Sequence, residues 1–319
     1  MTPPPRPRGR LRWSTLVKAV FLVAAVAFAV AFLASNWGQA RVALTRLSPA
    51  AVVLSVVLAS AGQVTAMLSW RATLADLGHP LSFGAAARVF YLSQLGKYVP
   101  GSVWQLAALM ELGRRHEVAR RDLAVSGVLS LLVSLTTAAV AGGLLLLMGG
   151  VDQARHWLWV APIVVVLAIV ALHPRLAGPV VDALLRLLRR APLDRRWTEV
   201  GVLRMSGWQT LTWLLYGGHC WALVVGMGAP AAASFVPAVG GFAVAYAAGT
   251  VFLPAPAGAG VREAVLGAAL AGLLDGGAVV VVVLLSRMIL TVVDAAFGLG
   301  AAALSRGAGR WSPDEPAPH

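Results

Sequence analysis

The chain has little charge and almost no cysteine, and both shortages exclude whole classes of protein. Charged residues make up 12% of its 319 positions and hydrophobic residues 59%, whereas soluble domains average about 25% charged. One cysteine, Cys220, excludes a disulfide framework and a cysteine-rich metal site. We interpret the adjacent His219 as a hydrogen-bonded packing residue. A Walker loop, a Ser/His/Asp spacing and paired catalytic carboxylates are also missing, so we expect no enzyme, metal or cofactor.

Apolar runs long enough to cross a bilayer are abundant instead. A spanning helix needs about 20 mostly apolar residues. Such runs lie at 16–34, 49–69, 123–148, 157–173, 208–228, 235–254 and 278–304. Two interrupted apolar segments lie at 88–111 and 254–277. The sequence predicts an all-α polytopic membrane protein of about eight transmembrane helices plus a re-entrant segment, in two halves that each contain a broken helix.

The positive charge lies in the gaps between the apolar runs. A net charge of +13 would suggest nucleic acid in a soluble protein, but basic residues here do not interleave with aromatics in a polar domain. We therefore expect no nucleic-acid partner, and we interpret these residues as topology signals and contacts with anionic lipids. Their concentration in the N-terminal tail and in the loop at 174–207 predicts a bacterial-type inner (cell) membrane protein with both termini cytoplasmic.

The predicted organisation is a single transmembrane domain at 16–304 between two tails. The tail at 1–15 is basic and expected to be disordered, and a second tail occupies 305–319. The first apolar run exceeds the usual signal-peptide core of about 7–15 residues, so we expect an uncleaved helix. Within the loop at 174–207, "GPVVDALLRLLRRAPL" predicts an amphipathic helix on the membrane surface.

The first interrupted segment contains "YLSQLGKYVPGSVWQ", Tyr91 to Gln105. Basic residues flank it on both sides, which places both flanks in the cytoplasm and predicts a re-entrant segment. The chain can reverse in "KYVPG", because Pro100 cannot donate to a helix ladder and Gly101 tolerates unusual dihedrals.

The second interrupted segment, "PAPAGAGVREAVLGAALAGLLDGG", joins a Pro/Gly-rich front to a predicted helix of about 14 residues. Seven extended residues reach roughly 20 Å and 14 helical residues roughly 21 Å. Together they would cross the membrane, although a half-entering segment is the alternative. Interrupted helices at matching places in two halves point to a transport site, because irregular backbone at membrane depth must be buried or line a polar cavity. Packing kinks are the other interpretation.

The two motifs together resemble the transmembrane region of lysylphosphatidylglycerol synthases, over roughly Leu16 to Leu304. In the bifunctional synthases this region resembles a flippase for aminoacylated phosphatidylglycerol, and a separate cytosolic domain makes the lipid. The sequence shows no such domain after its last helix. The resemblance therefore implies a stand-alone member that binds and translocates a lipid headgroup without aminoacyl transfer. The lipid itself does not transfer with the fold.

Charges at membrane depth cost roughly 2.5–3.5 kcal/mol each and are therefore candidate site residues. Lys97 and Arg262 lie in the two broken segments and can meet a lipid phosphate, arginine bidentately and lysine as a point charge. Snorkelling of Lys97 and an ion pair for Arg262 are the alternatives. Asp294 can receive a proton or pair with Lys97 or Arg262, and Arg287 can pair with Glu263; an interhelical ion-pair lattice would explain the same charges.

The predicted partner is a membrane lipid with an anionic or phosphate-containing headgroup, and a homo-oligomer or a cytosolic enzyme partner stays open. Two other functions also stay open: a small-solute secondary transporter, and a non-transporting subunit that docks a cytosolic enzyme through the loop at 174–207. The predicted substrate-binding residues are Gln94, Lys97, Tyr98, Pro100, Gly101, Trp104, Gln105, Gly258, Gly260, Arg262, Glu263, Arg287 and Asp294.

Overall fold

A computed structural model describes residues 47–98, 103–148, 172–187, 197–251 and 258–307, together with the isolated positions 41, 45, 163, 166, 167, 170, 191 and 193. Within these residues all regular structure is helical, which confirms the all-α prediction. The predicted first helix, most of the run at 157–173, the N-terminal tail, Pro100 and Gly101 lie outside the described residues.

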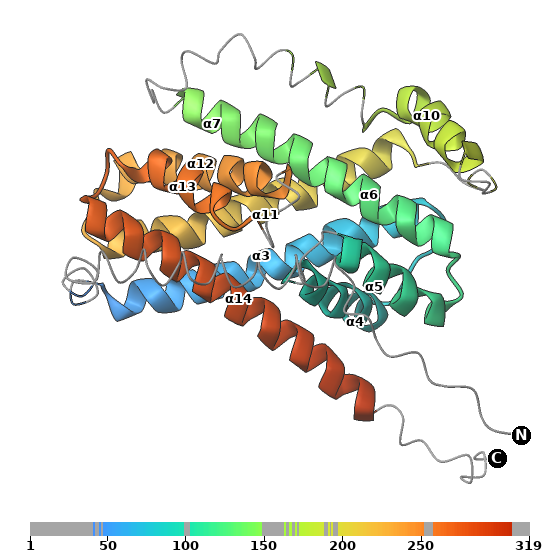
Figure 1. The fold of residues 1–319 in the computed structure, drawn as a ribbon, viewed down its shortest axis with the longest axis horizontal. Helices are drawn as coiled ribbons and strands as arrows, with labels where there is room; N and C mark the ends of the chain where they lie inside the picture. The colour runs from blue at the N-terminus through green and yellow to red at the C-terminus, as the bar shows by residue number, and fades with distance from the viewer. Residues whose placement is uncertain are drawn as a thin grey trace, which may run out of the picture.

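The fold contains both long and short helices (Figure 1). Among the described residues, four helices are long and apolar enough to cross a membrane: α3, α6 with its continuation to Leu145, α12, and α14 as far as Ala303. In chain order the helices are α3 (Pro49–Asp76), α4 (Phe83–Gln94), the 3-10 helix η1 (Leu95–Tyr98), α5 (Val103–Gly113), the 3-10 helix η2 (Arg114–His116), α6 (Arg120–Thr137), the π-helix η3 (Ala138–Gly142), α7 (Gly143–Met148), α10 (Pro174–Leu187), α11 (Glu199–Gly226), α12 (Ala231–Val251), α13 (Val261–Leu270) and α14 (Gly276–Gly307).

The antiparallel helices α3 and α11 pack along their lengths at the centre of the fold. At one end the Ser48 N–H donates to the Gly226 carbonyl at 3.3 Å. At the other end the Asp76 carboxylate accepts from the Thr198 N–H at 2.6 Å and from its hydroxyl at 2.9 Å. Thr198 in turn caps α11. This capping explains why α11 begins at Glu199 rather than at the start of the apolar run at 208.

In the first half the short helices α4 and α5 form a hairpin between the long helices α3 and α6, and in the second half the long helix α12 and the short helix α13 lie between α11 and α14. The α4–α5 hairpin lies towards the end of α3 that carries Asp76, and the α12–α13 pair lies towards the opposite end (Figure 1). Helix α6 begins at the first end, where Asp122 contacts His79 at 3.0 Å. Helix α14 begins at the second end, where Ala278 packs against Met227. The two halves therefore run in opposite directions, and α14 packs against both α4 and α13.

Helix α13 is shorter than the sequence predicted: it has ten residues rather than about 14. The Asp275 carboxylate accepts from the Ala278 N–H at 2.9 Å, so α14 begins at Gly276, inside the segment assigned to the preceding helix. Helix α13 runs back along α12, because Gly258 lies against Gly249 and Ala269 lies against Gly241. The start of α13 is thereby fixed to the C-terminal part of α12.

Replacing Gly258 with alanine is expected to destabilise this second hairpin. Gly258 has a φ of +70°, and a Cβ there would lie 2.6 Å from the Gly249 Cα. The left-handed backbone costs a non-glycine residue about 1–2 kcal/mol, and the overlap adds to that cost. Thermal unfolding in detergent should show a lower Tm than wild type. Gly300→Ala is the matched control, since a Cβ at Gly300 meets nothing within 4 Å; equal Tm values for the two variants would contradict the prediction.

Candidate functional site

Asp294 of α14 is the centre of a buried polar network. Its side chain is 4% exposed, and the Lys97 ammonium lies 2.7 Å from Oδ2. The Tyr98 hydroxyl donates to the same oxygen at 2.5 Å. Oδ1 accepts from the Gln63 Nε2 at 2.7 Å. The predicted pair of Lys97 with Asp294 is therefore present, and the carboxylate is bonded at both oxygens.

The tip of the α4–α5 hairpin brings Lys97 and Tyr98 to this carboxylate. Both residues belong to η1, which ends α4. The hairpin is held on α14 by the Tyr91 ring, whose centroid lies 4.8 Å from that of Phe297. It is also held by Leu95, which packs so closely on Gly298 that a Cβ there would lie 2.9 Å from the leucine. Apolar packing along the hairpin thus fixes the position of its charged tip.

The network continues into the central helix pair. The Tyr216 hydroxyl of α11 donates to the Gln63 Oε1 of α3 at 2.5 Å, and both residues are buried. Neither residue is among the predicted site residues, since both lie in long helices. The signal that could have found Gln63 is an amide inside the otherwise apolar run at 49–69.

A second cluster lies at the start of α13. The Arg287 guanidinium donates to Glu263 Oε1 at 2.5 Å, so this predicted pair is also present. Glu263 Oε2 accepts from the Gly260 N–H at 2.6 Å, which caps the helix. Gly260 has a φ of +89°, a backbone that favours glycine. The Glu263 carboxylate therefore links α13 to α14 and also caps the first turn of α13.

Arg262, in the first turn of the same helix, has a different environment. Its guanidinium carbon lies 4.8 Å from the ring centroid of Phe242 and 5.2 Å from that of Tyr246, both on α12. Its Nη2 is buried and has no hydrogen-bond partner among the described residues. No ion pair joins Arg262 to any carboxylate among the described residues. A buried charged donor without an acceptor is unusual in native structures and requires an explanation.

The two clusters approach the same helix. Lys97 contacts α14 at Asp294 and Glu263 contacts it at Arg287, seven residues earlier and therefore roughly 10 Å away along the axis. Each of the two ion pairs has no net charge. Arg262 therefore gives this region a net charge of one positive unit.

The other predicted site residues have less defined surroundings. Gln94 and Gln105 are partly buried and Trp104 is exposed. The close approach at Gly258 is to Gly249 of the protein itself. The roles assigned to these residues, and to the undescribed Pro100 and Gly101, stay predictions. His219 donates to or accepts from the Ser286 hydroxyl at 2.8 Å, which confirms it as a hydrogen-bonded packing residue.

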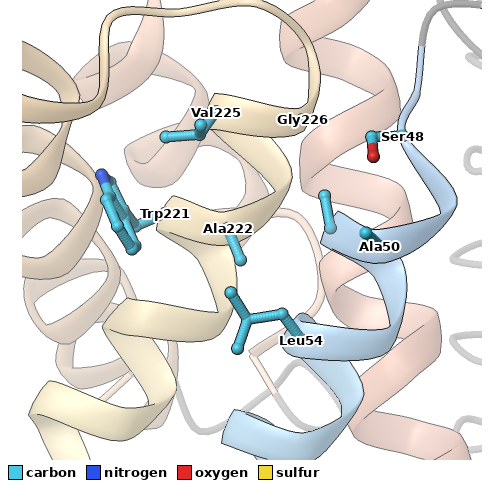
Figure 2. Close-up of a pocket in the computed structure, with 8 residues that line it drawn as sticks. Ser48, Ala50, Leu54, Trp221, Ala222, Val225 and Gly226 are labelled. Atoms are coloured by element: carbon cyan, nitrogen blue, oxygen red, sulfur yellow. The ribbon is translucent and has the colours of Figure 1, made fainter.

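One surface hollow among the described residues lies away from these clusters. It is a groove of about 370 Å³ between the first turns of α3 and the last turns of α11, and Figure 2 shows Leu54 and Trp221 among its lining. No charged side chain belongs to its described lining, so it does not offer a partner for a charged group. The clusters around Asp294 and Arg262 are therefore the candidate site.

Comparison with known families agrees with this architecture. The model of the lysylphosphatidylglycerol synthase TM region matches residues 16–298. Comparison with curated proteins gave no significant match. The matched range includes both hairpins, the Asp294 network and Arg262. Because the match extends over most of the chain, this multi-pass membrane protein belongs to the family of the lysylphosphatidylglycerol synthase TM region.

Proposed function

We propose that this protein binds the phosphate of a lipid headgroup between the tips of its two hairpins and lets the lipid change leaflets. The observation that carries the proposal is the Nη2 of Arg262, a buried cationic donor with no acceptor in the part of the chain that the structure describes. A phosphate supplies an anionic, multidentate acceptor that suits a guanidinium. The rings of Phe242 and Tyr246 support the guanidinium, but they accept no ordinary hydrogen bond from it.

The charge balance supports an anionic ligand. Lys97 and Arg287 each have a carboxylate partner, and Arg262 has none among the described carboxylates. An anionic ligand would supply the opposite charge that Arg262 lacks among these residues. A zwitterionic or cationic headgroup still carries such a phosphate, so the geometry favours phospholipids as a class rather than one headgroup.

The arrangement of the hairpins supports movement between leaflets. The α4–α5 hairpin has basic residues at its outer end, Arg114 and Arg115 among them, so we place that end at the cytoplasm and infer a re-entrant segment. The α12–α13 pair comes from the opposite end. Interrupted segments that converge near the middle from opposite sides are the arrangement that lets a transporter expose one site alternately to each side. We place the protein in a bacterial-type inner membrane with both termini cytoplasmic.

The test is leaflet exchange in vesicles. The full chain is reconstituted with a fluorescent phosphatidylglycerol, and a membrane-impermeant quencher reports the lipid in the outer leaflet. Exchange well above that of protein-free vesicles is expected, and vesicles that contain heat-denatured protein are the control. Uptake of a small solute without any lipid exchange would favour a secondary transporter. A protein that exchanges no lipid but loses its cellular function when Arg189 and Arg190 are neutralised would favour a docking subunit.

A further inference from the structure

We infer that headgroup binding is coupled to the uptake of one proton by Asp294. This inference deepens the proposed function and rests on it. The Lys97 ammonium, which is one of two cations at the hairpin tips that could meet a phosphate, is held by the Asp294 carboxylate at 2.7 Å. An anion that recruits Lys97 must therefore compete with this carboxylate.

The competition leaves Asp294 in a poor environment for a charge. Without Lys97 the carboxylate keeps two neutral donors, the Gln63 amide and the Tyr98 hydroxyl. A buried carboxylate that loses its cation is strongly disfavoured, and such groups become neutral by binding a proton. The proton comes from solvent and forms an O–H bond at Oδ2, which Lys97 has vacated. One negative charge enters with the phosphate and one positive charge with the proton, so the net charge of the region is unchanged.

The surroundings of Asp294 single it out as the carboxylate that loses its cation when Lys97 moves. Glu263 is the other carboxylate of the site, and it keeps both Arg287 and the Gly260 N–H when Lys97 moves. The α3 neighbour, Gln63, does not titrate. The titratable groups that face this region are Lys97 and Tyr98 on η1, Tyr216 on α11, Tyr246 on α12, Arg262 and Glu263 on α13, Arg287 on α14, and Tyr91 on α4, which packs on Phe297.

The pair can be reached from the surface of the protein. The Lys97 side chain is 20% exposed, so the pair is accessible from the hairpin tip. The Tyr98 hydroxyl touches Oδ2 and lies 3.5 Å from the Thr291 hydroxyl on an exposed part of α14. Polar groups therefore lead from the surface to the carboxylate. A headgroup that crosses with a proton would respond to the pH difference between the two sides of the membrane.

The experiment is calorimetric titration of the purified full chain with dihexanoyl phosphatidylglycerol at pH 7, in two buffers with different ionisation enthalpies. The phosphodiester does not titrate near neutral pH, so any proton comes from the protein. We expect uptake of about one proton per bound lipid and an affinity that falls by up to roughly tenfold per pH unit as the pH rises. Asp294→Asn should remove both effects. Glu111→Gln, which changes an exposed carboxylate that pairs with Arg120, should leave both as in wild type.

Lys97→Gln is a second variant with a different prediction. Without the lysine, Asp294 is already protonated before the lipid arrives, so any lipid that binds through Arg262 should bring no proton uptake. Lipid binding without proton uptake in wild type would overturn the coupling and leave the proposed function standing. No binding of the lipid at all would overturn both. Proton uptake that persists in Asp294→Asn would overturn the assignment of the proton to this residue.

Discussion

Replacing Arg262 with methionine is expected to slow leaflet exchange of phosphatidylglycerol by about 10- to 100-fold. Hydrogen bonds to a charged group contribute about 1.5–3 kcal/mol, and each 1.4 kcal/mol corresponds to about a factor of ten. Methionine keeps much of the apolar stem that lies against Phe242 and Tyr246 but offers no donor to a phosphate. The measurement is the quencher assay in vesicles that contain equal amounts of wild-type and variant protein.

The same substitution should leave the protein at least as stable to heat as wild type. Arg262 has no carboxylate partner among the described residues, so its removal leaves none of them uncompensated. The variant loses a cation–π contact of about 0.5–2 kcal/mol but no longer buries a charged donor that lacks an acceptor. A residue whose substitution lowers the activity without lowering the stability of the fold is typical of a ligand site.

Arg262→Lys is the matched control for this prediction. Lysine keeps the charge but loses the planar fork, so it should exchange lipid at an intermediate rate. Wild-type exchange in Arg262→Met would refute the assignment of Arg262 to the headgroup. A clear drop in the Tm of Arg262→Met would instead indicate a structural role, since it would reveal a stabilising contact of the guanidinium.

The ion pairs of the site could be predicted from the sequence because a charged side chain at membrane depth needs an oppositely charged partner. Lys97 with Asp294 and Glu263 with Arg287 follow from the need of each buried charge for an opposite one. Neutral polar groups carry no such requirement. Gln63 and Tyr216 therefore gave no comparable signal, although they complete the Asp294 network.

Other features needed the three-dimensional arrangement. Phe242 belongs to an ordinary apolar run in the sequence, and only the return of α13 along α12 places its ring at Arg262. The length of α13 was overestimated because Asp275 begins the next helix rather than ending the previous one. Apolar runs locate the spans, whereas local capping bonds decide where each helix begins.

Replacing Arg287 with methionine is expected to destabilise the protein by about 3 kcal/mol, at the lower end of the cost of breaking a buried pair. The Glu263 carboxylate would then keep the Gly260 N–H but lose its cation. The lower end applies because the two side chains are not fully buried: 25% and 22% of their surfaces are exposed. Unfolding from mixed micelles by titration with a denaturing detergent gives the free-energy difference. Arg114→Met, which removes an exposed partner of Glu111, should cost at most about 1 kcal/mol.

The double variant Arg287→Met/Glu263→Gln separates the charge effect from lost packing. Glutamine keeps the shape of Glu263 and can still accept from the Gly260 N–H, and it no longer carries a charge that needs Arg287. If the ion pair is the reason for the loss, the double variant should recover most of the stability that Arg287→Met loses, and the coupling energy should exceed about 1 kcal/mol. Strictly additive losses would mean that Arg287 stabilises α14 through its other contacts. In that case Glu263 would act mainly as the cap of α13, and the tip of the second hairpin would be held by its backbone alone.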